Sequence, residues 1–303
     1  MPEISVIICT HNPRPDFFRR TLDGLKSQTL SREQWEFLLI DNASKEILAP
    51  AWDLSWHPMG RHIREEQLGL TVARLRGIRE SNAELIVFVD DDNVLFPDYL
   101  ALCSRLARDW PLLGAWGGQH FPEFEGGPPA EKWKADFWTN TLSRDLWSNF
   151  YDLQAAPSGA GVCVRKKVAL KYAELTNSDP LRQRLGRKGS KLNGGEDFDM
   201  VFVACDLGMG LGRFVSLKLH HLMPTKRTDD DYLLRLYEGY AYSQVVLDSL
   251  RGIKAPPTRR IDRTASFLKR LFLQPMERKM AVAWENGIIR AINELEGISP
   301  PQK

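Results

Sequence analysis

The chain has 303 residues, 43% of them hydrophobic and 26% charged, and its formal net charge at pH 7 is +2. This is the composition of an ordinary soluble globular protein with enough apolar residues for a sizeable core. No stretch approaches the roughly 18 apolar residues of a membrane span, and the amino-terminal residues do not resemble a signal peptide, so we expect a cytoplasmic protein. The four cysteines form no CxxC pair, which favours reduced thiols over a metal cluster.

Strand and helix patterns alternate in the first third of the chain. The expected strands are residues 4–9, 37–40 and 85–89, and the expected helices lie around residues 18–25 and at residues 69–81. The strands are β-branched or apolar runs, whereas the helices repeat apolar residues at three- and four-residue spacing. This alternation implies βαβ units. We therefore expect an α/β fold in which a mostly parallel central sheet is flanked by helices.

The remainder of the chain alternates less regularly. Strands are expected at residues 114–119, 160–164 and 214–219, and a helix is expected to begin at Glu196 and Asp197 and to end before residues 208–212. Residues 121–151 are rich in Trp, Phe, Pro and Gly, and a long irregular segment of this kind is more often functional or a lid than a linker. Residues 176–195 are polar, basic and glycine-containing, which predicts a mobile surface loop.

Polar residues follow each strand of the first third. Residues 90–92 are three consecutive aspartates that end the strand 85–89, while Thr10 and Asn12 follow the first strand and Asp41 follows the second. In a parallel sheet the carboxyl ends of the strands share one edge, where ligands bind. Adjacent acids repel one another unless a cation offsets them, and Mg²⁺ or Mn²⁺ binds through carboxylates together with substrate phosphates. The pattern predicts a metal-diphosphate site, and its alternative is a solvated turn.

Six segments, taken in order, resemble the family 2 glycosyltransferases, which are inverting enzymes with the GT-A fold. The segments are SVIICTHN, FLLIDNAS, GLTVARLRGI, VFVDDDN with FPDYL, GAGVCVRK, and GGEDFDM followed by a histidine pair. The resemblance covers residues 4–223. It departs from the family pattern where Leu75 follows Ala73 and Arg74, because the family commonly has Asn there, and this puts one helix contact in doubt.

The resemblance implies a nucleoside-diphosphate sugar donor, with UDP as the usual nucleotide, a saccharide or lipid-linked acceptor, and Mn²⁺ or Mg²⁺. Asp41 matches the acid that hydrogen-bonds the nucleotide base, and Asp197 matches the general base of the Glu196–Asp197 pair. The expected donor contacts are Thr10, Asn12, Asp41, Arg74, Asp90 and Asp91. The expected metal ligands are Asp90, Asp92 and His220, with His221 as the alternative to His220 and a structural role as the alternative for both. Residues 1–250 would form the catalytic domain, with a nucleotide-sugar half at 1–115 and an acceptor half at 116–250.

The chemistry can also be argued from the residues. Departure of a nucleoside diphosphate from the anomeric carbon develops charge on the phosphate, which a cation held by Asp92 and Asp90 would offset. The acceptor hydroxyl attacks the opposite face and needs a base within hydrogen-bond reach, a role that suits Asp197. A helix amino terminus favours the ionised form of Asp197. The plainer interpretation of Glu196 and Asp197 is a pair of ordinary first-turn acids.

Several side chains have structural alternatives to a functional role. Arg74 would reach the base or a phosphate, or would lie on a solvated helix face. The basic residues between 182 and 191, and Lys226 with Arg227, would close over the diphosphate or would be solvated. Trp133, Trp138 and Trp147 would stack on an acceptor sugar, although packing is the commoner use of tryptophan.

Two other functions compete with the transferase. Residues 90–94 also satisfy the DxDx[TV] pattern of phosphohydrolases, although that family places the pattern on its first strand. A catalytically silent nucleotide-sugar-binding or scaffold protein would not need Asp197. A nucleic-acid role has only the charge of the tail to support it, so we expect no nucleic-acid partner.

Residues 251–303 carry 11 basic and five acidic side chains and are expected to form a basic helical extension. Within it, residues 259–273 place Phe267, Leu268, Leu271 and Phe272 on one helical face, with basic residues around them. Such a helix can lie on an anionic membrane, which would make the enzyme peripheral at the inner face of the membrane. Alternatively, the helix docks on the catalytic domain or on a second copy of the chain, which would make a homodimer.

Overall fold

The computed structural model describes residues 1–130, 133, 141–187, 192–253 and 273–297. It divides into two compact units: Met1–Ser178 with Asp197–Thr225, and Asp179–Glu196 with Lys226–Lys303. Helices α7 (Asp230–Leu250) and α9 (Pro275–Leu295) both belong to the second unit. The domain boundary expected at residue 250 falls between them and stays a prediction. The predicted basic helix at residues 259–273 lies outside the described residues, as do Trp138, Lys188 and Lys191.

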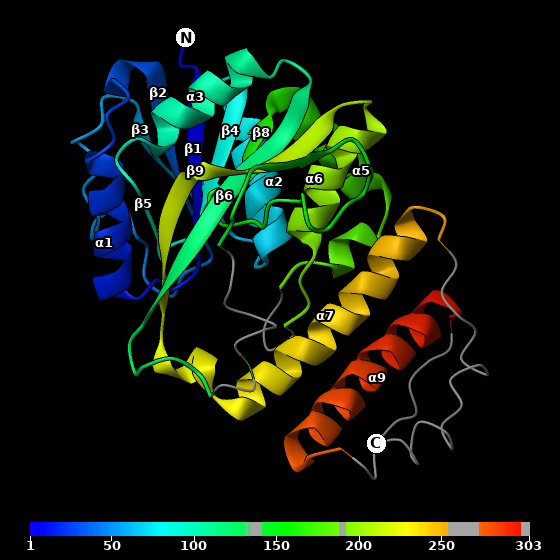
Figure 1. Cartoon of the computed structure of the whole chain (residues 1–303). Helices are drawn as coiled ribbons and strands as arrows, with labels where there is room; N and C mark the ends of the chain where they lie inside the picture. The colour runs from blue at the N-terminus through cyan, green and yellow to red at the C-terminus, as the bar shows by residue number, and fades with distance from the viewer. Residues whose placement is uncertain (131–132, 134–140, 188–191, 254–272, 298–303) are drawn as a thin grey trace. The chain divides into compact units, whose positions relative to one another are not determined.

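The first unit is a nine-stranded sheet with the order β3-β2-β1-β4-β8-β6-β9-β5, and β7 pairs with β9 (Figure 1). The strands are β1 (Ile4–Thr10), β2 (Trp35–Asn42), β3 (Gly60–Glu65), β4 (Leu85–Val89), β5 (Asn93–Leu95), β6 (Leu113–Phe124), β7 (Leu146–Ser148), β8 (Cys163–Arg165) and β9 (Gly210–Met223). Strands β1 to β4 pair in parallel, as expected for βαβ units. Strand β8 runs antiparallel between β4 and β6, while β6 and β9 are again parallel. The predicted, mostly parallel α/β sheet is confirmed.

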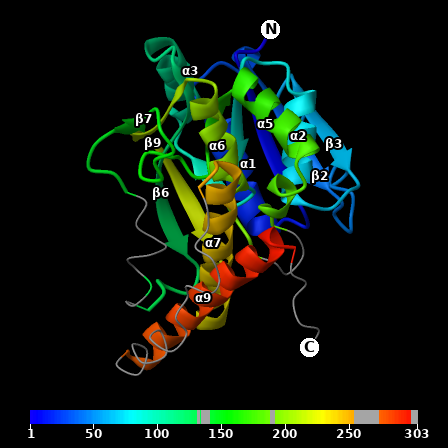
Figure 2. The same ribbon diagram turned by 90° about the vertical axis from the view of Figure 1, so that its right-hand side faces the viewer.

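Helices cover both faces of this sheet. They are α1 (Pro15–Lys26), α2 (Leu70–Glu80), α3 (Tyr99–Asp109), α5 (Lys166–Ser178) and α6 (Glu196–Asp206). Helices α1 and α3 pack on one face of the sheet, and α2, α5 and α6 pack on the other. Figure 2 shows α2 beside α5. The central strands are therefore buried on both sides, which explains the unbroken apolar runs such as residues 85–89.

The second unit contains two long helices, α7 (Asp230–Leu250) and α9 (Pro275–Leu295), which pack against each other. Short 3-10 turns occur in the chain at Arg32–Gln34, Arg182–Arg184 and Thr225–Thr228. The described residues of the segment 176–195 do not form the surface loop that was expected. Its first residues end α5, and Arg182 and Asn193 are buried. None of the described helices combines the length and the apolar character needed to cross a bilayer.

Candidate active site

Strand β4 ends in the three aspartates, and each of them points to a different neighbour. Asp91 accepts a short hydrogen bond from the Thr10 hydroxyl at the end of β1, and its carbonyl accepts one from Thr21 Oγ1 at 3.1 Å. Asp91 therefore ties β4 to β1 and α1. Asp90 keeps 37% of its side chain exposed and lies 3.6 Å from Arg74. The predicted convergence of the β1 and β4 ends is present.

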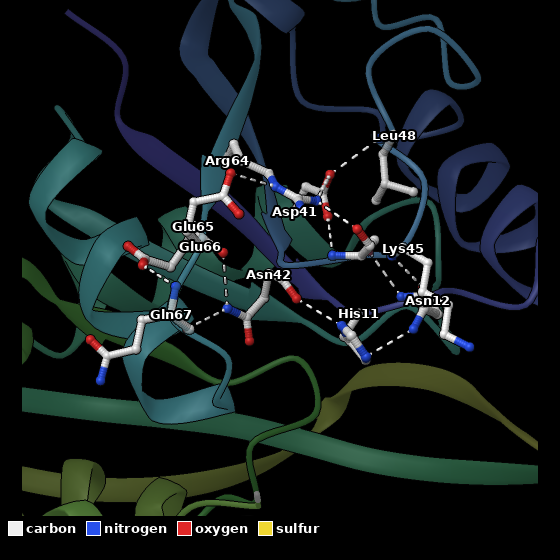
Figure 3. A network of polar contacts seen from close by, with 11 residues as sticks. His11, Asn12, Asp41, Asn42, Lys45, Leu48, Arg64, Glu65, Glu66 and Gln67 are labelled. Carbon is white, nitrogen blue, oxygen red and sulfur yellow. Dashed lines mark hydrogen bonds and ion pairs between the residues drawn. The ribbon is translucent and has the colours of Figure 1, made fainter. Parts of the chain in front are cut away.

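Asp41 closes β2 and is almost fully enclosed by its own loop. Its carboxylate accepts hydrogen bonds from the backbone N–H groups of Ser44 at 3.1 Å and Leu48 at 3.2 Å, and from Arg64 Nη1 at 2.8 Å (Figure 3). Burial alone would raise the pKa of Asp41, but these hydrogen bonds outweigh it and lower the pKa. Asp41 is therefore ionised and holds the loop after β2 in place. A nucleotide base that hydrogen-bonds to Asp41 would use the same carboxylate oxygens as these protein groups.

A second polar network joins the ends of β1 and β2. His11 Nδ1 lies 2.8 Å from the carbonyl oxygen of Asn42, and the side-chain oxygen of Asn12 accepts from the Lys45 N–H at 2.8 Å (Figure 3). Asn12 and Ala43 both have positive φ, 51° and 53°, a conformation that costs energy for residues other than glycine. Strain of this kind is often found at ligand sites.

Arg74 is buried in α2, which contradicts the alternative of a solvated helix face. Only 3% of the residue is exposed, and its guanidinium lies 5.6 Å from the centre of the Phe88 ring, in addition to its contact with Asp90. The fold thus brings Asp90, at the predicted strand end, together with Arg74 of the predicted helix. A buried cation beside these acids reduces their mutual repulsion.

Asp92 lies beside His221 rather than His220. Its carboxylate accepts from Asn93 Nδ2 at 3.0 Å and is 3.5 Å from His221 Nε2, and only 5% of Asp92 is exposed. The pairing of β5 with β9 sets Asn93 opposite His221. His220, the ligand that we expected from the sequence, instead lies 3.0 Å from Glu123 and stacks on Phe96. Its assignment as a metal ligand stays a prediction that these contacts do not favour.

Asp197 is half-buried at the start of α6. Its Oδ2 accepts the Gly159 N–H at 2.7 Å, and its Oδ1 accepts the N–H of Phe198 at 2.9 Å. A Cβ at residue 159 would lie 2.8 Å from Arg74 Nη2 and 3.2 Å from Asp197 Oδ2, so a larger residue there would push these two groups away. Asp197 and Arg74 therefore both lie beside Gly159, and Arg74 lies in turn beside Asp90. Glu196, the other predicted catalytic residue, is buried one residue earlier.

The sequence did not single out His120, which lies near these residues. It is buried on β6, and its Nε2 is 3.4 Å from Ser158 Oγ, next to Gly159. Burial lowers the pKa of His120 to about 3, and the nearby charges of His221 and Arg213 lower it further. His120 is therefore neutral at physiological pH. The only signal in the sequence was a histidine directly after the predicted strand at residues 114–119.

The residues present supply part of a metal site. Within the described part of the chain, no three His, Cys, Asp or Glu side chains gather into a set that could hold a metal alone. Asp92 and His221 do face each other, and a carboxylate with an imidazole suits Mn²⁺. A cation of this class takes its remaining ligands from water and substrate phosphates. The pair fits a metal that arrives with a diphosphate.

Residues 5–169 match the family model described as Glycosyl transferase family 2. The match spans more than half of the 303 residues, and the chain belongs to this family. The resemblance that the sequence segments indicated is thereby confirmed. The strand ends and Arg74 described above fall within the matched region, while Asp197 and His221 lie beyond it.

Relatives and solved structures agree with this assignment. A Haloferax volcanii protein named Glycosyltransferase AglE is 30% identical over 150 residues, which is 48% of each chain, so the match spans about half the length of that relative. Another protein of this organism, named Glucosyl-dolichyl phosphate glucuronosyltransferase, is 21% identical over 252 residues, 82% of this chain and 78% of that one. The structure of S. aureus TarS 1–349 in complex with UDP has a TM-score of 0.53 at 13% identity, covering 98% of this chain and 83% of that one. This likeness shows the shared fold.

Proposed function

We propose that the protein transfers a sugar, with inversion, from a UDP-sugar to an acceptor hydroxyl. The observation that carries the proposal is the position of Asp197 and Arg74 beside Gly159, with Arg74 3.6 Å from Asp90. The Asp197 carboxylate is oriented by two backbone N–H groups, and it lies beside a buried cation. This is the arrangement that a general base needs next to a negatively charged donor.

The other residues would divide the work as follows. Arg74 would interact with the charge of the donor phosphates. Asp41 and Asn12 would shape the base pocket through the loop after β2, because Asp41 holds Ser44 and Leu48 while Asn12 holds Lys45. Asp197 would accept the proton of the acceptor hydroxyl as that oxygen attacks the anomeric carbon, and the carbon's bond to the diphosphate would break on the opposite face.

Asp92 and His221 would hold Mn²⁺ or Mg²⁺ together with the diphosphate. When bound, the cation supplies electrostatic stabilisation of the leaving phosphate. His221 takes the place of His220 in this proposal, because its Nε2 faces Asp92. Neutral His120 would keep the surroundings of His221 free of a further positive charge.

The acceptor is proposed to be a lipid-linked saccharide, with the enzyme at the cytoplasmic face of a membrane. The support is the relative that matches 82% of this chain, whose name specifies transfer to a glucosyl-dolichyl phosphate. A polysaccharide or glycoconjugate product is consistent with such an acceptor.

A thermal-shift screen with UDP, GDP and TDP, each with and without Mn²⁺, tests the donor proposal. We expect the largest rise in Tm with UDP plus Mn²⁺, because ligands that bind only the folded state stabilise it. UDP-glucose, UDP-N-acetylglucosamine and UDP-glucuronic acid would then be compared for release of UDP. A protein whose Tm responds to none of the nucleotides would contradict the proposal.

A further inference from the structure

The chain that leads into α6 belongs to the second unit and is held there by hydrogen bonds to other residues of that unit. We call residues 192–196 the entry segment. The Asn193 side-chain oxygen accepts from Arg290 Nη2 at 2.8 Å, and Asn193 Nδ2 donates to the carbonyl of Arg184 at 3.3 Å. The Gly194 N–H donates to Ser243 Oγ at 3.1 Å. Asn193 and Ser243 are both buried, so water does not replace these partners easily.

Arg290 is fixed by more than this one contact. Its Nη1 lies 2.9 Å from Glu238 Oε1 on α7, and its guanidinium lies 4.5 Å from the ring centre of Tyr242. The Tyr242 hydroxyl donates to Glu294 on α9 at 2.7 Å. A guanidinium held by an ion pair and an aromatic face loses little further freedom when it binds Asn193. Arg290 is therefore a preorganised donor toward the entry segment.

Two helical glycines allow the backbones to come this close. A Cβ on Gly239 of α7 would lie 2.3 Å from the carbonyl oxygen of Leu192, and one on Gly287 of α9 would lie 2.2 Å from the carbonyl oxygen of Glu238. Glycine inside a helix is destabilising relative to alanine, so its presence at both positions needs a reason. The close approach of α9 to α7, and of α7 to the entry segment, accounts for glycine at both positions.

The entry segment ends one peptide bond before Asp197. Gly194 and Gly195 precede Glu196, and Gly195 has a φ of 101°, so this part of the backbone would be flexible without its side-chain contacts. Since α6 begins at Glu196, whatever fixes residues 193–195 also fixes the direction in which the helix starts. We propose that Arg290 is a positioning residue for Asp197, and this proposal rests on the transferase function proposed above.

The test compares Arg290→Gln with a matched control, Arg184→Gln, in the full chain. The Arg184 side chain also reaches α9, where it lies 3.4 Å from Glu294, but Asn193 contacts only its backbone carbonyl. Hydrogen exchange measured by mass spectrometry should show tenfold or faster exchange of the backbone amides of residues 194–198 in Arg290→Gln. The control should exchange like the wild type, and Arg290→Lys should fall between the two.

Kinetics supply the second measurement, using UDP release from the donor selected by the UDP-sugar panel. Arg290→Gln should lower kcat about tenfold, while KM for the donor and the affinity for UDP plus Mn²⁺ stay within twofold. Asn193→Ala should reproduce this result, and the double variant should be no worse than either single variant. Asn193→Ala also serves as the test if Arg290→Gln fails to fold.

The outcomes separate this proposal from the proposed function. Unchanged exchange in Arg290→Gln, equal losses in Arg184→Gln, or faster exchange with unchanged kcat would each overturn the positioning role. A wild-type chain that neither binds UDP nor releases it from a donor would overturn the transferase function, and with it the role of Arg290 in catalysis. The exchange data would then still report whether Arg290 holds the entry segment.

Discussion

The amino and carboxyl ends of the parallel strands, here called the amino edge and the carboxyl edge of the sheet, both carry carboxylates that differ in their burial and partners. At the amino edge, Glu36 accepts hydrogen bonds from Ser5 Oγ at 2.6 Å and from the backbone and side chain of Asn82 at 2.6 and 3.0 Å, with Arg61 at 3.4 Å. At the carboxyl edge, Asp90 remains partly exposed, 3.6 Å from Arg74. A carboxylate whose hydrogen bonds are all made within the protein, such as Glu36, stabilises the structure. A partly exposed carboxylate such as Asp90, whose arginine partner is 3.6 Å away, can still bind a ligand.

Asp41 makes this comparison sharper, because it lies at the carboxyl edge and yet has the surroundings of Glu36. Both are buried, both accept from backbone N–H groups, and both have an arginine partner. The position at the carboxyl edge predicted a ligand contact for Asp41, while its full set of hydrogen bonds indicates that it organises the loop after β2. The position of an acid in the sheet and the number of hydrogen bonds that its carboxylate already accepts from the protein are therefore separate criteria for a functional acid.

The largest expected effect is on stability, at the amino edge. Glu36→Gln should lower the free energy of unfolding by about 2–4 kcal/mol, because it removes a buried, paired charge and leaves donors without an ionised acceptor. Urea unfolding measures the loss, and calorimetry with UDP plus Mn²⁺ should show unchanged affinity. The exposed neighbour Glu33→Gln is the control and should change stability by less than about 0.5 kcal/mol. A loss of UDP affinity in Glu36→Gln would break the distinction between the two edges.

Substitution of Asp197 is expected to affect turnover and not nucleotide binding. Asp197→Asn should slow UDP release roughly 10²-fold or more, the range for removal of a general base, and should bind UDP nearly as well as the wild type. Asp206→Asn, at the exposed end of the same helix, is the control. Equal turnover in Asp197→Asn and the wild type would remove Asp197 from the mechanism.

Substitutions of Asp92, His221 and His220 should differ in their effect on metal-dependent UDP binding. Asp92→Asn and His221→Gln should each weaken UDP binding in Mn²⁺ about tenfold or more, with little change when the metal is omitted. His220→Gln is the matched control, because its neighbours are Glu123 and Phe96. Calorimetry that shows the larger loss for His220→Gln would reverse the assignment.

The pH dependence of stability should show the contribution of Glu36 and Asp41, the two buried acids that accept several hydrogen bonds from the protein. Burial would raise the pKa of Glu36, but hydrogen bonds from Ser5 and Asn82 outweigh it and lower the pKa, as they do for Asp41 with its own partners. Their contribution is therefore fully present above the pKa values of the unfolded chain, about 4.3 for Glu and 3.9 for Asp, and is lost as the pH falls through the lower folded values. The free energy of unfolding should fall below about pH 4.3, and Glu36→Gln should make this fall shallower. An identical acid limb in the variant would contradict the role of Glu36.

The smallest effect is expected at Ala43. Ala43→Gly relieves a left-handed conformation worth about 1 kcal/mol, but the freedom of glycine in the unfolded chain offsets most of this. Stability should change by less than about 1 kcal/mol, whereas Ala51→Gly in the exposed turn should only destabilise. A loss of more than about 2 kcal/mol in Ala43→Gly would mean that the methyl group has a role beyond tolerating the strain.

The strand ends could be predicted from the sequence, because apolar runs and their polar endings are local and a parallel sheet gathers its carboxyl ends. The choice between His220 and His221 could not, because adjacent residues of a strand face opposite sides and only the pairing with β5 decides which one meets Asp92. Helix α7 was missed because it buries residues on more than one face, which obscures its period. The partner of Asp197 is Gly159, a contact between distant segments that no local pattern encodes.

The pairing of β5 with β9 also determines when the site can exist during synthesis. Strands β1, β2 and β4 can assemble with α1 and α2 once residue 89 has left the ribosome, since the pairings of β1 with β2 and β4 lie within that stretch. Asp92 is made next, but His221 reaches it only after more than a hundred further residues have been added. The nascent chain therefore carries the parallel strands β1, β2 and β4 long before Asp92 acquires its imidazole partner. Any polypeptide that ends before residue 221 lacks the Asp92–His221 pair.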